Sequence, residues 1–112
     1  MQIARRSAGD VTVIDIAGEL DRDNLDRLRH IFREALEHGA KKLLLNMARV
    51  SAIDDTGLDE LRSLAVAAGH HGAKLRPYSL PRDAVEQLAL TKLLTVFDTY
   101  ENEADALAGF GG

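Results

Sequence analysis

The strongest structural signal lies in Lys42-Leu-Leu-Leu-Asn46 and in the segment that follows, Val50-Ser-Ala-Ile-Asp-Asp-Thr-Gly-Leu-Asp-Glu-Leu61. Three consecutive leucines form a continuous apolar centre, which is typical of a strand covered on both faces. A loop through Arg49–Asp55 then leads into a helix, whose apolar residues recur at spacings of three and four: Leu58, Leu61, Leu64, Ala65 and Ala68. A buried strand followed by an amphipathic helix is the repeating unit of a parallel α/β sheet.

The residues before this unit predict a hairpin and another helix. Val11–Ala17 is rich in β-branched residues and is bounded by turn residues, and Gln2–Arg6 can pair with it across the turn-like Ser7–Asp10. The expected helix has Asp21 or Asp23 as its N-cap, ends at Gly39 and turns these residues inward: Leu25, Leu28, Phe32, Ala35 and Leu36.

The residues after this unit continue the alternation of strands and helices. Gly69 or Gly72 ends the second helix, and Ala73–Arg76 is expected to be a short strand that stops at Pro77. Ser79 and Pro81 are expected to open a third helix, which turns Val85, Leu88 and Ala89 inward. A strand at Thr95–Phe97, a helix at Glu101–Ala108 and a flexible tail at 109–112 are expected to follow. We therefore expect one α/β domain over residues 1–112, with a mostly parallel sheet of four to five strands covered by about four helices.

Composition narrows the classes of function. The 112 residues are 46% hydrophobic and 29% charged, which is ordinary for a globular domain. A formal net charge of −4 argues against a general nucleic-acid binder, and the absence of cysteine removes disulfides, thiol catalysis and thiolate metal sites. The N-terminus lacks the apolar stretch of a secretory signal, and no apolar run approaches a bilayer span. We expect a cytoplasmic protein without direct membrane contact.

The turn Asp54-Asp55-Thr56-Gly57 is the most specific candidate for a functional site. Functional sites of open parallel sheets gather beyond the carboxyl ends of strands, where loops meet helix N-termini. Ile53 and Leu58 are expected to anchor the turn inward. Thr56 is predicted at or next to the helix N-cap, and Gly57 allows a close backbone approach.

Four ordered segments carry a family resemblance over about residues 8–108. Ile53-Asp-Asp-Thr-Gly-Leu58 resembles the Asp-Ser-Ser-Gly loop of STAS domains, the family of bacterial anti-sigma-factor antagonists. Ala17-Gly-Glu-Leu-Asp21 is similar to the opening Gly-Glu-Leu-Asp segment of those proteins, and Leu43-Leu-Leu-Asn46 to the strand that precedes their phosphorylation loop. Leu88–Phe97 resembles the hinge before their last strand. Four segments in the right order are more specific than one short motif.

The resemblance implies a phosphorylation switch rather than an enzyme. Thr56 falls on the phosphoacceptor, and the implied partners are a GHKL-type kinase that is also the anti-sigma factor and a PP2C-type phosphatase. It also allows a weak homodimer. The partner-binding residues it implies are Asp21, Asp54, Asp55, Thr56, Gly57, Leu58, Asp59 and Arg62. The sequence departs from the family pattern in having threonine where serine is commoner, and in Asp55, a permanent charge where a second hydroxyl would stand.

Other interpretations of the same residues are less specific. Thr56 could be a plain N-cap, with Asp59 reaching back toward it. The acids of the turn could bind Mg²⁺, although acids in a first helical turn usually complement the helix dipole. The Arg27–Arg33 stretch is most simply the solvated face of the first helix. No histidine cluster, nucleophile elbow or phosphate-binding glycine loop is present, so we expect no metal, no cofactor and no catalytic residue.

Two other functions stay open at the level of sequence. One is a non-cycling STAS subunit of a larger assembly, such as a lipid-transport ABC system or a stressosome-like scaffold, which the fixed charge of Asp55 would suit. The other is a module that binds a small ligand or nucleotide. The shortage of aromatic residues near the turn gives little material for a stacking pocket, since tryptophan is absent and only two tyrosines occur.

Overall fold

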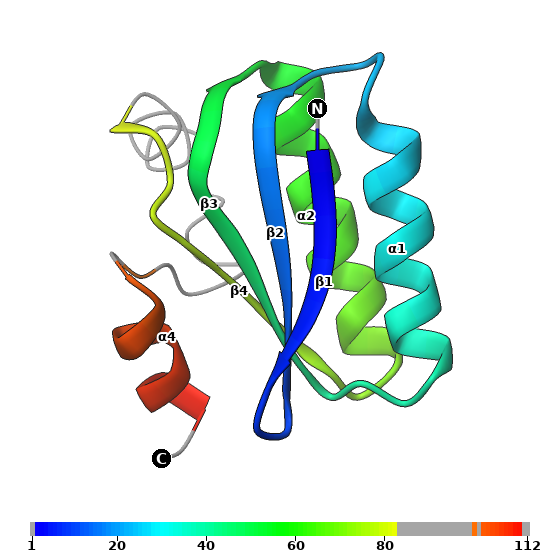
Figure 1. Ribbon diagram of the computed structural model, residues 1–112. Coiled ribbons are helices and arrows are strands. Elements are labelled where there is room, and N and C mark those ends of the chain that lie inside the picture. Colours follow the sequence, from blue (N-terminus) through cyan, green and yellow to red (C-terminus); the bar gives the residue numbers. More distant parts are fainter. Residues whose placement is uncertain (1, 83–99, 101, 111–112) are drawn as a thin grey trace.

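The computed structural model describes residues 2–82, 100 and 102–110, which form a mixed sheet with helices on both faces (Figure 1). The elements, in chain order, are β1 (Gln2–Ala8), β2 (Val11–Leu20), α1 (Leu25–Glu37), β3 (Lys42–Ile53), α2 (Asp55–His70), β4 (Lys74–Tyr78) and α4 (Glu103–Phe110). The strand order is β1-β2-β3-β4; β1 is antiparallel to β2, and the other two pairings are parallel. The expected α/β domain with a mostly parallel sheet is thus confirmed in outline.

The three leucines of β3 explain why both sheet faces are covered. Leu43 and Leu45 belong to the larger core, beneath α1 and α2, whereas Leu44 belongs to a smaller core on the opposite face, near α4. All three are fully buried. Because successive side chains of a strand point to opposite faces, a continuous apolar run is the pattern that such a central strand requires.

Helix α1 confirms its predicted buried face but not its predicted cap. The five apolar residues expected to turn inward are all buried. The N-cap is Asn24 rather than Asp21 or Asp23, and its side chain donates to the carbonyl oxygen of Glu19 instead of capping the helix. The Asp21 carboxylate accepts from the backbone N–H of Asp23 and so shapes the turn before the helix. Gly39, with φ of 89°, follows the helix end as expected.

All four strands extend beyond their predicted ends: β1 reaches Ala8 rather than Arg6, and β2 reaches Leu20 rather than Ala17. β3 continues to Ile53, where a loop was expected, because the end of β2 pairs with it as far as Leu20 opposite Ile53. β4 continues through Pro77 to Tyr78, although Pro77 was expected to stop it. The Pro77 carbonyl accepts from the N–H of Tyr100, on the side away from β3, so the missing N–H of the proline breaks no pairing with β3.

The later part of the chain is only partly comparable with the prediction. The helix expected to contain Val85, Leu88 and Ala89 and the strand expected at Thr95–Phe97 lie outside the described residues. The last helix begins at Glu103 and reaches Phe110, so it includes two residues that were expected in the tail. The described part of the chain therefore shows three helices rather than the four expected for the whole chain.

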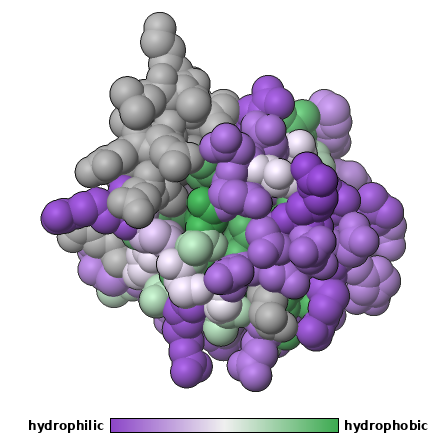
Figure 2. Space-filling model, turned by 90° about the horizontal axis from the view of Figure 1, so that it is seen from above, coloured by the Kyte–Doolittle hydropathy of each residue, from purple (hydrophilic) through white to green (hydrophobic). Residues whose placement is uncertain are grey.

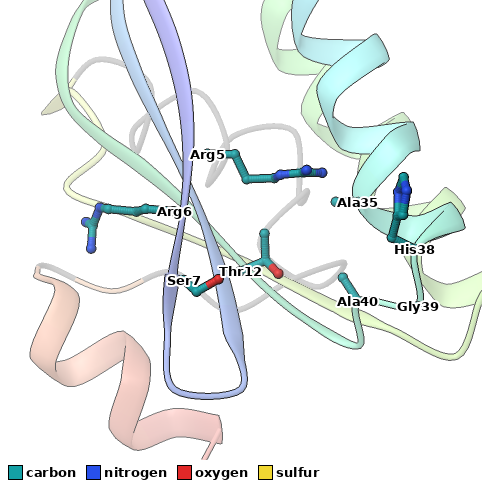
Figure 3. A pocket seen from close by; sticks show the side chains of 8 residues that line it. All are labelled: Arg5, Arg6, Ser7, Thr12, Ala35, His38, Gly39 and Ala40. Atoms are coloured by element: carbon teal, nitrogen blue, oxygen red, sulfur yellow. The ribbon is translucent and has the colours of Figure 1, made fainter.

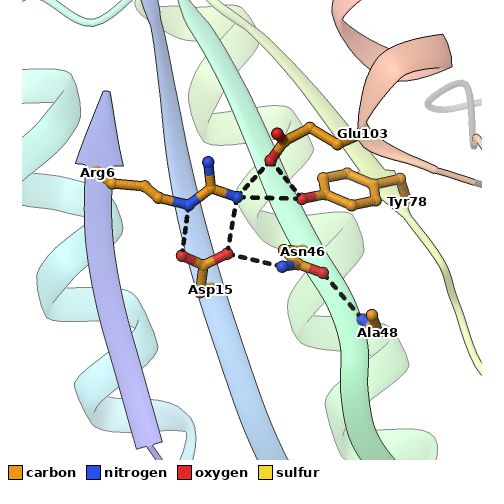
Figure 4. Close-up of polar contacts among 6 residues, drawn as sticks. All are labelled: Arg6, Asp15, Asn46, Ala48, Tyr78 and Glu103. Carbon is orange, nitrogen blue, oxygen red and sulfur yellow. Dashed lines mark hydrogen bonds and ion pairs between the residues drawn. The ribbon is translucent and has the colours of Figure 1, made fainter. Parts of the chain in front are cut away.

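A polar network attaches α4 to the sheet (Figure 4). The Arg6 guanidinium of β1 donates to Asp15 of β2, at 2.7 Å from Nε to Oδ2, and to Glu103 of α4. The Tyr78 hydroxyl donates to Glu103 at 2.8 Å, and Asn46 donates to Asp15 at 2.7 Å. Residues from all four strands and from α4 are thereby joined on the face opposite α1 and α2. No local sequence pattern indicates this network, because Arg6 and Glu103 are 97 positions apart.

This network predicts a pH-dependent stability. Arg6 is the main cause of the lowered pKa of both Asp15 and Glu103, and the Tyr78 hydroxyl also lowers that of Glu103. Carboxyls with a lowered folded-state pKa stabilise the fold above their unfolded values of about 4, and this stability is lost as the pH falls through the folded-state pKa. Arg6→Gln should therefore reduce the drop in unfolding free energy between pH 7 and pH 3.

The matched control is Arg5→Gln, because Arg5 lies on the same exposed strand and the network does not include it. Urea unfolding at a series of pH values measures the effect. An identical pH dependence in the two variants would contradict this account of the network.

Candidate functional site

The candidate site lies where α1 and α2 begin, at one edge of the sheet. β2 and β3 are parallel, so their carboxyl ends meet at this edge, the upper one in Figure 1. Thr56 lies in the first turn of α2 and is half-buried. Figure 2 shows the molecule from this end, where hydrophilic residues border a smaller area of less polar ones.

Asp54, not Thr56, caps the helix. Asp54 has extended backbone angles, and its Oδ1 accepts from the N–H of Gly57 at 2.8 Å. This is the usual geometry of an N-cap carboxylate, which satisfies one of the free N–H groups at a helix start. The sequence placed the cap at or next to Thr56, which is two residues too late. The Thr56 hydroxyl is consequently not needed to begin the helix.

Gly57 presses the first turn of α2 against the end of β2. A Cβ at this position would lie 2.5 Å from the carbonyl oxygen of Leu20 and 2.9 Å from Cγ2 of Ile53. The predicted close backbone approach is therefore present. Leu58 is only 4% exposed and belongs to the larger core. Gly57 and Leu58, both implied as partner-binding residues, thus lie beneath the surface and support the turn from inside.

The remaining residues implied by the resemblance reach the surface. Asp54, Asp55, Asp59 and Arg62 are exposed, and Asp21 is half-buried in the neighbouring turn between β2 and α1. The carboxylates of α2 lie near the positive end of the helix dipole, which favours negative charge there. At this edge the neutral hydroxyl of Thr56 therefore lies among acidic side chains.

Glu60 is not one of the free acids of this turn. It is 8% exposed, and the Arg29 guanidinium of α1 holds both of its oxygens, with Nε to Oε1 and Nη2 to Oε2 at 2.8 Å each. The Glu60 carboxylate is also the main cause of the raised pKa of Arg29. Arg29 was expected to lie on the solvated face of the first helix. No local pattern connects two residues 31 positions apart.

Two cavities lined by described residues lie away from Thr56. One of about 380 Å³, lined by Arg5, Thr12 and His38 among others, lies between the β1–β2 hairpin and the end of α1 (Figure 3). Another of about 580 Å³ lies on the sheet beside Asp15, Asn46 and Arg49. No residue of the 54–59 turn lines either cavity. Neither cavity therefore places a small ligand against the candidate phosphoacceptor.

Two further observations concern the described residues alone. Among them, no three side chains of histidine, aspartate or glutamate form a group that could hold a metal ion. None of the helices seen in this part of the chain has the length and apolar character needed to cross a membrane.

Comparison with known proteins identifies the family. The STAS domain model matches residues 2–106, so this chain belongs to the STAS domain family. A proposed anti-sigma factor antagonist from Thermotoga maritima has a similar structure, with a TM-score of 0.87, 21% identity, and 96% of this chain and 92% of that chain covered. A comparison with curated proteins gave no match.

Two other solved structures show how widely this fold is used. An anti-sigma factor antagonist from Mycobacterium paratuberculosis gives a TM-score of 0.85 at 19% identity, covering 96% of this chain and 92% of that one. A sulfate transporter family protein from Wolinella succinogenes gives 0.78 at 22% identity, covering 90% and 84%. At these identities the likeness concerns the fold, and function has to be argued from the site.

The packing of Gly57 makes its replacement costly. Gly57→Ala should lower the unfolding free energy by about 1–3 kcal/mol, because the added methyl group forces backbone at Leu20 or the side chain of Ile53 to move. Gly69→Ala is the matched control in the same helix, with no atom within 4 Å of its Cβ position. It should be neutral or stabilise by up to about 1 kcal/mol. Urea denaturation compares the two, and equal effects would rule out the close approach.

The cap makes a separate prediction. Asp54→Ala removes the acceptor for the Gly57 N–H and should cost about 1 kcal/mol of stability. Thr56→Ala should change stability by less than about 0.5 kcal/mol, because its hydroxyl does not cap the helix. Thermal unfolding of both variants at one pH measures the difference. A larger loss for Thr56→Ala than for Asp54→Ala would show that the cap is assigned to the wrong residue.

Proposed function

We propose that this chain is an anti-sigma-factor antagonist that works as a phosphorylation-controlled protein-binding switch. Its partner is a GHKL-type serine/threonine kinase that is also the anti-sigma factor. The unphosphorylated chain binds this partner through the surface formed by Asp21, Asp54, Asp55, Thr56, Asp59 and Arg62. Phosphorylation of Thr56 releases the partner, and a PP2C-type phosphatase resets the switch. The chain is the substrate of these enzymes and carries out no catalysis itself.

The observation that carries this proposal is that the Thr56 hydroxyl is not needed to cap the helix. It lies in the first turn of a helix that Asp54 already caps, on residues held in place by the packing of Gly57. A kinase can transfer the γ-phosphoryl group of ATP to this oxygen, with ADP as the leaving group and the hydroxyl proton lost. The fold does not depend on the atom that changes, so the modification alters the surface while the domain stays folded.

The charge at this surface explains how phosphorylation could release a partner. A phosphate adds about −1.5 to −2 charges at neutral pH. The helix N-terminus favours that charge, whereas the exposed carboxylates of Asp54, Asp55 and Asp59 oppose it. A partner surface fitted to a neutral hydroxyl would also have to desolvate the phosphate. One unpaired interfacial charge costs about 2–4 kcal/mol, which corresponds to roughly 30- to 1,000-fold in affinity.

The names of two similar structures support the proposal of an anti-sigma-factor antagonist. The Thermotoga maritima and Mycobacterium paratuberculosis proteins are both described as anti-sigma factor antagonists, the first as a proposed one. Both cover nearly all of this chain, so the fold is shared from β1 to α4. Our assignment of Thr56 as the acceptor rests on the motif and on the geometry of the turn.

Asp55 supports a second candidate function. Its exposed carboxylate stands directly before Thr56, as the first residue of α2, and gives the surface a permanent charge. Such a surface would suit a STAS subunit that stays bound in a larger assembly, such as a lipid-transport ABC system or a stressosome-like scaffold. The likeness to a sulfate transporter family protein shows that the fold itself is compatible with functions outside sigma-factor control.

The proposed switch can be tested with the GHKL-type kinase encoded nearest to the gene for this chain. Incubation with ATP should label the wild-type protein, and Thr56→Ala should remove the label. Thr56→Glu should weaken binding to the kinase by at least about 30-fold, because it places a fixed charge at the acceptor. Isothermal titration calorimetry measures the affinities.

Ser7→Glu is the matched control, because Ser7 is an exposed hydroxyl residue near the β1–β2 turn, at the opposite end of the sheet from Thr56 (Figure 1). It should leave binding nearly unchanged. Tight binding that Thr56→Glu does not weaken would argue against the switch. Copurification of the chain with a transport ATPase, or in a large stable complex, would favour the second candidate.

A further inference from the structure

The flank of α2 that faces α1 carries both Thr56 and Glu60. The two residues are four positions apart, so their side chains lie one above the other on the same side of the helix. Glu60 is held by Arg29 of α1, which shows that this side faces α1. The two helices lie side by side on one face of the sheet (Figure 1). Thr56 is therefore one helical turn from an arginine-bound carboxylate.

Arg29 still has donor capacity in the direction of Thr56. Its Nε and Nη2 are used by Glu60, while Nη1 donates to Asp26 at 3.2 Å. Asp26 lies one turn nearer the start of α1, and both helices start at the same sheet edge, so Nη1 is directed toward the end where Thr56 lies. The Asp26 side chain is 96% exposed. An exposed ion pair of this kind contributes little and is easily exchanged.

We propose that Arg29 is the internal counter-ion of the phosphate on Thr56. Nη1 leaves Asp26 and donates to a phosphate oxygen, while Nε and Nη2 stay on Glu60. This inference rests on the proposed function only in taking Thr56 as the modified residue. Arginine suits this role because its planar fork presents five donors and can bind two anions at once.

The other charged groups near the turn are less suited to the role. Arg62 is six residues from Thr56 along α2, which places it roughly 120° away around the helix. Asp55, Asp59 and Asp26 repel a phosphate. Glu60 would also repel it if it were free, but its charge is already balanced by Arg29. The nearly buried carboxylate thus acts as a positioning residue, which fixes the arginine close to the modification site.

A protein with phosphothreonine incorporated at position 56 during translation tests this inference without any kinase. The second pKa of the phosphate, about 6 in an unpaired group, is measured by ³¹P NMR titration. Contact with Arg29 should lower it by about one unit relative to Arg29→Gln. Arg62→Gln is the matched control and should leave the phosphate pKa at its wild-type value.

Additional variants separate the contact from a purely structural effect. Arg29→Gln leaves Glu60 without its partner, and a free carboxylate so close would itself raise the phosphate pKa. Arg29→Gln/Glu60→Gln is therefore measured as well, and its phosphate pKa should lie below that of Arg29→Gln but still above the wild-type value. Glu60→Gln keeps the arginine and should keep a lowered pKa. An equal phosphate pKa in wild type and in Arg29→Gln/Glu60→Gln would overturn the inference, as would a rise caused by Arg62→Gln. Release of the partner by phosphorylation is a separate measurement, so either proposal can fail while the other stands.

Discussion

The contact between the first turn of α2 and the end of β2 is the constraint on which the site depends. The Asp54 N–H donates to the carbonyl oxygen of Leu20, and Gly57 approaches the same oxygen so closely that no Cβ fits between them. Leu20 in turn pairs with Ile53 in the sheet. The start of α2 is therefore fixed by the β2–β3 register, and Thr56 is presented on a rigid base rather than on a loop.

Local patterns were sufficient to predict the buried faces of α1 and α2 and the central strand β3. The spacing of apolar residues in α1 and α2 identified the faces that pack on the sheet, because helical periodicity depends only on neighbours three and four positions away. The run Leu43–Leu45 identified the central strand for a similar reason. The candidate site could be placed because a parallel sheet brings strand ends and helix starts to one edge.

Features that depend on contacts between distant residues could not be predicted. β3 is longer than expected because its last residues pair with β2, and that register is invisible in the β3 sequence. The N-cap of α2 is Asp54 rather than a residue at or next to Thr56. Asp54, Asp55 and Thr56 can all cap a helix, and the packing of Gly57 against β2 selects among them. Arg6 and Glu103 are 97 positions apart, so no local pattern connects them.

The four acidic residues in and just before the first turns of α2 have different surroundings and therefore different effects on Thr56. Asp54 caps the helix, and Asp55 and Asp59 remain in solvent, where they favour a neutral group at Thr56. Glu60, the only one of the four that is nearly buried, is neutralised by Arg29 and adds little repulsion. The exposed carboxylates of Asp55 and Asp59 thus oppose a phosphate on Thr56, whereas Arg29 on the side facing α1 favours it. A phosphate on Thr56 would be drawn toward Arg29 of α1. The phosphorylated surface would then have one fixed arrangement of charge.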